Sequence, residues 1–171
     1  YRPIAASPGA ANPTAEVLPP FPKLWINEIQ PNNLTGITDN AGDRDPWVEL
    51  YNSGTNAIDL TGWYLADNYT NLTRWAFPAN TAIDPGAFLI VWLDGQPNQT
   101  TATSPHTSFR IPTGTGSLAL VFPFNSQPTV LDYVNYAALP ADRSYGLYPD
   151  GQTSARQIFY FTTPGGTNNN A

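Results

Sequence analysis

The sequence Trp-Val-Glu-Leu-Tyr-Asn (residues 47–52), followed by Ile-Asp-Leu-Thr-Gly-Trp-Tyr-Leu (residues 58–65), decides the fold of this chain. Both stretches are rich in β-branched and aromatic residues, which favour strands. Between them lies Asn-Ser-Gly-Thr-Asn (residues 52–56), and Gly and Asn tolerate the positive φ values that turns require. The pattern predicts a strand, a turn and a second strand.

The composition of the whole chain indicates one all-β domain. A chain of 171 residues that is 41% hydrophobic is long and apolar enough to bury its own core. Five Trp, nine Tyr and eight Phe fit pleated surfaces, and 18 Pro with 13 Gly supply frequent turns. No stretch has a sustained helical apolar period, so we expect little helix.

The charge and the rare residues limit the function classes. Thirteen acidic residues against seven basic ones give a net charge of −6, which argues against a nucleic-acid partner. The chain has no Cys, which excludes disulfides and thiolate metal sites. No apolar run is long enough to cross a membrane, so we expect no membrane insertion. The chain also lacks Met, which suggests a mature or excised piece of a longer, exported protein.

The chain divides into a linker, a domain and a tail. Residues 1–22 are rich in Pro and Ala and predict an extended linker. Residues 23–168 carry the strand candidates, and residues 169–171 predict a flexible tail. The strand candidates recur with turn signals every 8 to 12 residues or so, which is typical of a sandwich or barrel. We expect strands at 24–30, 47–52, 58–66, 73–77, 87–93, 107–111, 117–122, 130–136, 144–147 and 157–161.

An ordered set of short motifs resembles the lamin-tail domain in its bacterial form. The set runs from residue 24 to about residue 168. It includes the two stretches quoted above, the second of which continues with Ala-Asp (66–67). The other motifs are Leu-Trp-Ile-Asn-Glu-Ile (24–29), Trp-Ala-Phe-Pro (75–78), Ile-Asp-Pro-Gly (83–86), Trp-Leu-Asp-Gly (92–95), Ser-Tyr-Gly (144–146), Tyr-Pro-Asp-Gly (148–151) and Thr-Thr-Pro-Gly (162–165).

The resemblance implies an immunoglobulin-like β-sandwich of about nine or ten short strands. It also implies a non-catalytic accessory module of a larger exported bacterial protein, acting in binding, spacing or scaffolding at the cell surface or outside the cell. Its expected partners are neighbouring domains of the same polypeptide and a cell-surface protein or polysaccharide. The family implies no catalytic residue and requires no cofactor.

An acidic loop is the candidate metal site. Asp39, Asp43 and Asp45 lie within seven residues, and carboxylates on a flexible Gly-containing loop suit Ca²⁺. The spacing is not that of an EF-hand, and Arg44 would offset part of the charge. The alternative is a polar loop closed by Asx-turns, with no ion.

Aromatic residues that border turns are the candidate ligand-binding residues. Tyr and Trp faces stack against sugar rings, and an acidic, Asn-rich surface can bond hydroxyl groups. The residues that we expect to be exposed are Tyr64, Tyr69, Trp75, Tyr145 and Tyr148. Three other Trp residues lie within predicted strands and are expected to fill the core: Trp47, Trp63 and Trp92. A carbohydrate-binding module is therefore the alternative function.

Catalysis finds little support in the sequence. Glu28 and Glu49 lie mid-strand and would be neighbours if their strands pair, as in general acid–base pairs. The alternative is that the two carboxylates lie on the solvent face of the sheet or bond backbone N–H groups of a loop. His106 is the only His, and Ser144 follows Asp142 closely, but no spacing indicates a catalytic triad.

Overall fold

The computed structural model of the chain describes residues 8–9, 20–152 and 156–169. These residues form eleven β-strands and one 3₁₀ turn, Pro97–Gln99. The predicted all-β fold is confirmed, with slightly more strands than expected. No helix in the described ranges is long and apolar enough to cross a membrane. Most of the predicted linker 1–22 and residues 170–171 of the predicted tail lie outside the described residues.

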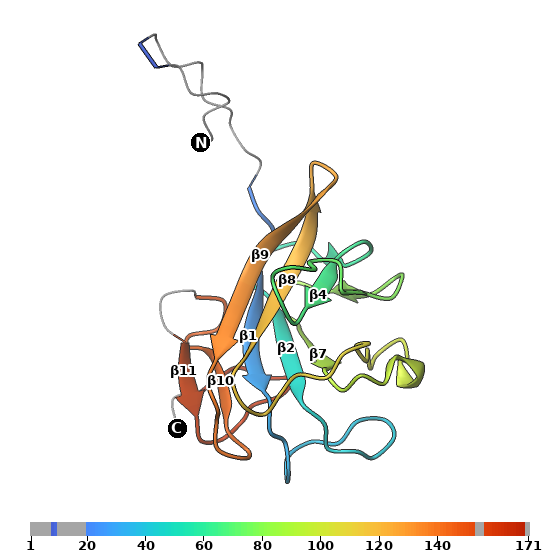
Figure 1. The fold of residues 1–171 in the computed structure, drawn as a ribbon, viewed down its shortest axis with the longest axis vertical. Coiled ribbons are helices and arrows are strands. Elements are labelled where there is room, and N and C mark those ends of the chain that lie inside the picture. Colours follow the sequence, from blue (N-terminus) through green and yellow to red (C-terminus); the bar gives the residue numbers. More distant parts are fainter. Residues whose placement is uncertain (1–7, 10–19, 153–155, 170–171) are drawn as a thin grey trace.

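Two antiparallel sheets form the layers of a sandwich (Figure 1). The larger sheet has the order β11 (Arg156–Phe159), β10 (Ser144–Leu147), β1 (Leu24–Gln30), β2 (Trp47–Asn52) and β7 (Phe88–Trp92). The smaller sheet has the order β5 (Trp75–Ala76), β4 (Tyr64–Ala66), β8 (Gly116–Phe124) and β9 (Gln127–Tyr136). A short separate pair joins β3 (Ile58–Asp59) to β6 (Ala82–Ile83). Strand β9 is therefore an edge strand of its sheet.

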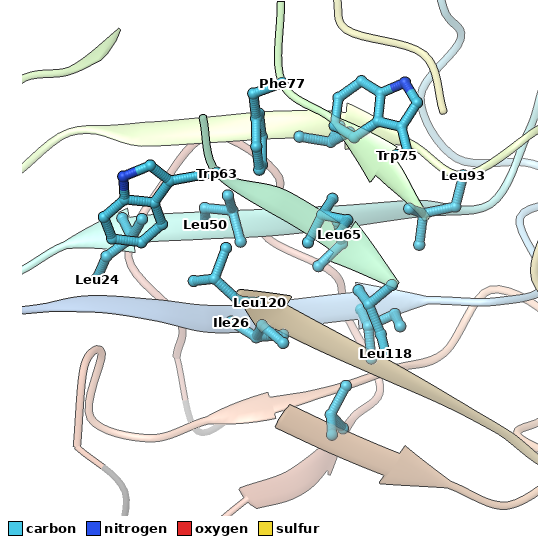
Figure 2. Close-up of a cluster of buried hydrophobic side chains, with 14 of the residues drawn as sticks. Leu24, Ile26, Leu50, Trp63, Leu65, Trp75, Phe77, Leu93, Leu118 and Leu120 are labelled. Carbon is cyan, nitrogen blue, oxygen red and sulfur yellow. The ribbon is translucent and has the colours of Figure 1, made fainter. Parts of the chain in front are cut away.

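The core lies between the two sheets. Figure 2 shows Ile26 and Leu50 from the larger sheet beside Leu65 and Leu120 from the smaller one, and all four are fully buried. Burying each such side chain stabilises the fold by about 1.5–3 kcal/mol. The predicted burial of Trp47, Trp63 and Trp92 is confirmed, but only Trp63 belongs to the core cluster between the sheets. Trp92 instead stacks on His106, and the Trp47 indole N–H donates to Gln30.

Two of the predicted strands are wrong, because one is split in two and the other does not form. The stretch 58–66 is two strands, β3 and β4, because a turn at Leu60 intervenes. The Trp63 N–H donates to the Leu60 carbonyl at 2.9 Å, and Gly62 has φ +79°. The stretch 107–111 forms no strand, since only isolated bridges hold its region to the end of β7. Strand β6 was not predicted because it has only two residues.

A partly buried ion pair joins the two sheets. Strand β1 bulges between Ile26 and Glu28, and its pairing with β10 starts only at Glu28. The backbone of Ile26 is bonded by side chains instead. Its N–H donates to Asp132 of β9 at 2.8 Å, and its carbonyl accepts from Arg156 of β11 at 2.6 Å. Arg156 also donates to Asp132 at 2.9 Å, so this pair satisfies the backbone at the bulge.

The close approach of β10 to β1 gives a stability prediction. A Cβ atom at Gly146 would overlap the Asn27 carbonyl oxygen and lie 3.0 Å from the Glu28 Cα. Both neighbours are backbone atoms of β1, which cannot rotate away. We therefore expect Gly146→Ala to lower the free energy of unfolding by about 1–3 kcal/mol, measured by urea denaturation. Gly114→Ala is the control, because no atom lies within 4 Å of its added Cβ. Equal stability of the two variants would contradict the prediction.

Candidate functional site

Two long loops meet where β1 ends, β2 begins and β7 ends. A backbone bond joins the two loops, because the Leu93 N–H donates to the Pro46 carbonyl at 2.8 Å. The second loop also folds back onto β7, since the Trp92 N–H donates to the Pro105 carbonyl at 2.9 Å. The Asn40 amide reaches across to the Gln99 carbonyl at 3.1 Å. The arrangement brings together polar residues that lie far apart in the sequence.

His106 is fully buried in this loop cluster. Its Nδ1 lies 2.6 Å from Asp94 Oδ2, and its Nε2 lies 2.7 Å from Asn40 Oδ1. The amide nitrogen of Asn40 donates to Gln99, so its oxygen must face the ring. Ser104 Oγ bonds the same Asn40 oxygen at 3.0 Å. The ring is thus held on both sides by oxygen atoms, and sequence reasoning missed these partners.

Asp39 has one satisfied and one unsatisfied carboxylate oxygen. Its Oδ1 accepts the N–H groups of Ala41 and Asp43, each at 2.8 Å, which forms the predicted Asx-turn. Its Oδ2 is buried without a hydrogen-bond partner among the described residues. A carboxylate oxygen of Asp39 lies within 4.8 Å of ligand atoms of Asp94 and His106.

The predicted calcium ligands also come together. Asp39, Asp43 and Asp45 offer carboxylate oxygens within 4.8 Å of one another. However, both oxygens of Asp45 have partners, because Oδ1 pairs with Arg110 and Oδ2 accepts from Gln96 at 3.4 Å. Calcium binding by this set stays a prediction.

A groove runs between edge strand β9 and strands β10 and β11. Its larger part has a volume of about 480 Å³ and is lined by Asp132, Tyr133, Val134, Asn135, Tyr145 and Arg156. A second part of about 260 Å³ continues past the shared residues Asn135 and Tyr145 to Ile158. Tyr133 is 56% exposed, so the groove offers aromatic surface and hydrogen-bonding groups together.

Two of the five predicted aromatic residues lie at or beside the groove. Tyr145 lines both parts of it. Tyr69 packs edge-on against Tyr133, with ring centroids 6.0 Å apart, and its hydroxyl donates to Asn135 at 2.5 Å. These contacts place Tyr69 at the rim.

The other three aromatic residues lie elsewhere. Tyr64 is half-buried against a small apolar cluster on the smaller sheet, and Tyr148 is exposed but does not line the groove. The expected exposure of Trp75 is wrong. Its ring is buried against Phe77 in the core, with centroids 4.9 Å apart.

Glu28 and Glu49 are neighbours across β1 and β2, as the sequence suggested, and both are fully buried. Glu28 accepts from Ser144 and from the Thr163 N–H at 3.3 Å. Glu49 accepts from Asn27 at 3.0 Å and from the Gly165 N–H at 2.6 Å. The two carboxylates therefore fasten the segment 163–165 onto the sheet, and the loop-bonding interpretation is confirmed.

Burial controls the protonation of these carboxylates. Desolvation raises the pKa of Glu49 to about 8, although the hydrogen bonds from Asn27 and Gly165 oppose the shift. Desolvation likewise raises the pKa of Glu28, against the hydrogen bonds from Ser144 and Thr163. The negative charges of Glu28 and Asp150 raise the pKa of Glu49 further.

Comparison with known proteins identifies the family. The sequence matches the Lamin Tail Domain family over residues 19–138, which is most of the chain. The chain belongs to the lamin tail domain family. This finding confirms the resemblance and its immunoglobulin-like fold. No curated protein matches the chain.

The lamin tail domain of this chain continues structurally beyond the matched residues. Strand β10 pairs with β1 and β11 pairs with β10, so both belong to the larger sheet. They also supply Tyr145 and Arg156 to the groove. Sequence analysis missed Tyr133, Asn135, Asp132 and Arg156 as site residues. The alternation of polar and apolar residues along β9 was the available signal.

The buried Glu49 predicts a pH-dependent stability. Because its pKa is raised from 4.5 to about 8 in the folded protein, the folded state binds the proton more tightly than the unfolded chain does. The contribution of protonated Glu49 to the free energy of unfolding is complete below about pH 4.5. It is lost as the pH rises towards 8, at about 1 kcal/mol per pH unit. Urea denaturation across this range measures the slope.

Glu49→Gln is the matched variant, since it copies the shape of the protonated side chain and cannot titrate. We expect it to give a shallower slope, with the remainder due to Glu28. Superimposable pH profiles of the variant and the wild-type domain would show that Glu49 does not carry the effect.

Proposed function

We propose that this lamin tail domain is a non-catalytic accessory module of a larger exported protein, and that it acts by binding. The groove between β9 and β11 carries the proposal, because it combines exposed aromatic surface with polar side chains in one concave place. Spacing and scaffolding of neighbouring domains is compatible with the same rigid sandwich. The acidic, Cys-free composition with a single Lys supports a location outside the cell or on its surface.

The side chains with catalytic potential support a non-catalytic role. Glu28 and Glu49 are fully buried and bonded to the segment 163–165, so a substrate would have to displace that segment. His106 is fully buried between Asp94 and Asn40. A general base must reach the proton that it abstracts, and these groups face the protein interior.

The basic residues likewise support a partner other than nucleic acid. Arg110 pairs with Asp45, and Arg156 pairs with Asp132. The Arg143 guanidinium lies over the Tyr160 ring, 4.9 Å from its centroid. A phosphate backbone would need these charges to be free on one face.

A carbohydrate is the ligand class that the groove favours. The exposed Tyr133 ring, supported edge-on by Tyr69, offers a face to a sugar ring. Asn135 lies in the same groove, and its side-chain amide can bond hydroxyl groups. A saccharide chain at a cell surface would thus meet aromatic and hydrogen-bonding groups side by side.

This proposal predicts glycan binding that depends on Tyr133. The isolated domain should bind members of a glycan array, and titration calorimetry with the strongest binder should show about tenfold weaker affinity for Tyr133→Ala, which loses the stacking surface. Phe161→Ala is the matched control, because Phe161 is a similarly exposed aromatic residue outside the groove lining.

A silent array would reject the carbohydrate interpretation. Equal loss of affinity in Tyr133→Ala and Phe161→Ala would place the binding surface elsewhere and contradict the role of the groove.

A further inference from the structure

We propose that residues 163–168 form a pH-sensitive strap, which is closed over the carboxylates of β1 and β2 at acid pH and opens as the pH rises, while the sandwich stays folded. The strap belongs to no strand. Three of its backbone N–H groups donate to carboxylates instead. These bonds join Thr163 to Glu28 at 3.3 Å, Gly165 to Glu49 at 2.6 Å and Asn168 to Asp150 at 3.0 Å.

The strap covers the face of the larger sheet that is turned away from the core cluster. Val48 and Leu50 pack in that cluster, so Glu49 between them points to the opposite face. Glu28 pairs with Glu49 across β1 and β2, and both residues are fully buried. Because the strap bonds both carboxylates on this face, its opening would bring them into contact with water.

The charged groups around the strap contacts are acidic. Glu28 of β1 and Asp150 of the turn between β10 and β11 both act on Glu49 through their negative charge. The strap itself, Thr-Pro-Gly-Gly-Thr-Asn, carries no charge. The ion pairs among the described residues involve other carboxylates, so none of them neutralises Glu28, Glu49 or Asp150. A charge on Glu49 is therefore unfavourable while the strap is closed, and water can solvate it once the strap opens.

Opening of the strap becomes more favourable as the pH rises. Burial raises the pKa of Glu49 from 4.5 to about 8 in the closed state, whereas in the open state the solvated carboxyl returns to its ordinary range. The closed state therefore binds the proton more tightly than the open state does. Between about pH 4.5 and 8, each pH unit shifts the equilibrium towards the open state by up to about tenfold. The raised pKa of Glu28 acts in the same direction.

The strap can open without the rest of the domain. Of its six residues only Asn168 is buried, so its release exposes little apolar surface. The Gly166 N–H donates to the Thr163 carbonyl at 3.0 Å, which is a bond within the strap and not to the sheet. Segments with few buried contacts open at a lower free energy than the core does. The inference is independent of the proposed ligand, because no residue of the strap lines the groove.

The test is backbone hydrogen exchange in the full chain, followed by NMR between about pH 5 and 8. The protection factor divides the intrinsic exchange rate at each pH by the measured rate. We expect the N–H groups of Thr163, Gly165 and Asn168 to be less protected at every pH than that of Leu120, which lies in the central strand β8. The protection of the strap should fall by up to about tenfold per pH unit until the strap is fully open.

Two variants assign the effect to the strap contacts. Glu49→Gln cannot titrate and should flatten the pH dependence at Gly165. Asp84→Asn is the matched control, because it removes the same charge from an exposed turn and should keep the wild-type pH dependence.

Three results would overturn the inference. Strap N–H groups as well protected as that of Leu120 at every pH would show that the strap opens only when the whole domain unfolds. Strap protection that does not change with pH would show that the carboxylates do not control it. Equal pH dependence in Glu49→Gln and Asp84→Asn would show that net charge, or another group, carries the effect.

Discussion

The bulge at Asn27 in β1 is the constraint on which the rest of the structure depends. A bulge leaves backbone groups of a central strand without strand partners, and a buried backbone group must be bonded. Asp132 and Arg156 bond Ile26 on one side of the bulge, and this bond joins the two sheets. The Asn27 side chain bonds Glu49 and Asp150, each at 3.0 Å. The bulge thus gathers the smaller sheet, strand β11 and the C-terminal part of the domain around β1.

The layered fold could be predicted from the sequence because it rests on local patterns. Alternation and turn chemistry located β1, β2 and β10 at their observed bounds. The expected burial of Trp47, Trp63 and Trp92 was correct, although only Trp63 packs in the core cluster between the sheets. The burial of Trp75 was not predicted, because a position beside a turn does not show how the chain folds back to pack Phe77 against it.

The sites could be predicted only in part because their contacts span long stretches of sequence. His106 looks isolated in the sequence, yet it bonds Asp94 twelve residues away and Asn40 sixty-six residues away. Glu28 bonds Thr163, 135 residues on. The acidic loop was visible because its members are close in sequence. The groove was not, because β9 and β11 become neighbours only through the sandwich.

The fastening of the segment 163–168 has a mechanical consequence. This segment pairs with no strand, yet Glu28 and Glu49 bond its backbone, and Asn168 donates to the Leu147 carbonyl at 2.8 Å. Tension applied at residue 169 would load these side-chain bonds before it reached the β10–β1 pairing. The segment would peel away first and lengthen the chain, while the sandwich behind it stayed intact. The hydrogen bonds of the β1 and β2 carboxylates would then break before the pairing of the strands is loaded.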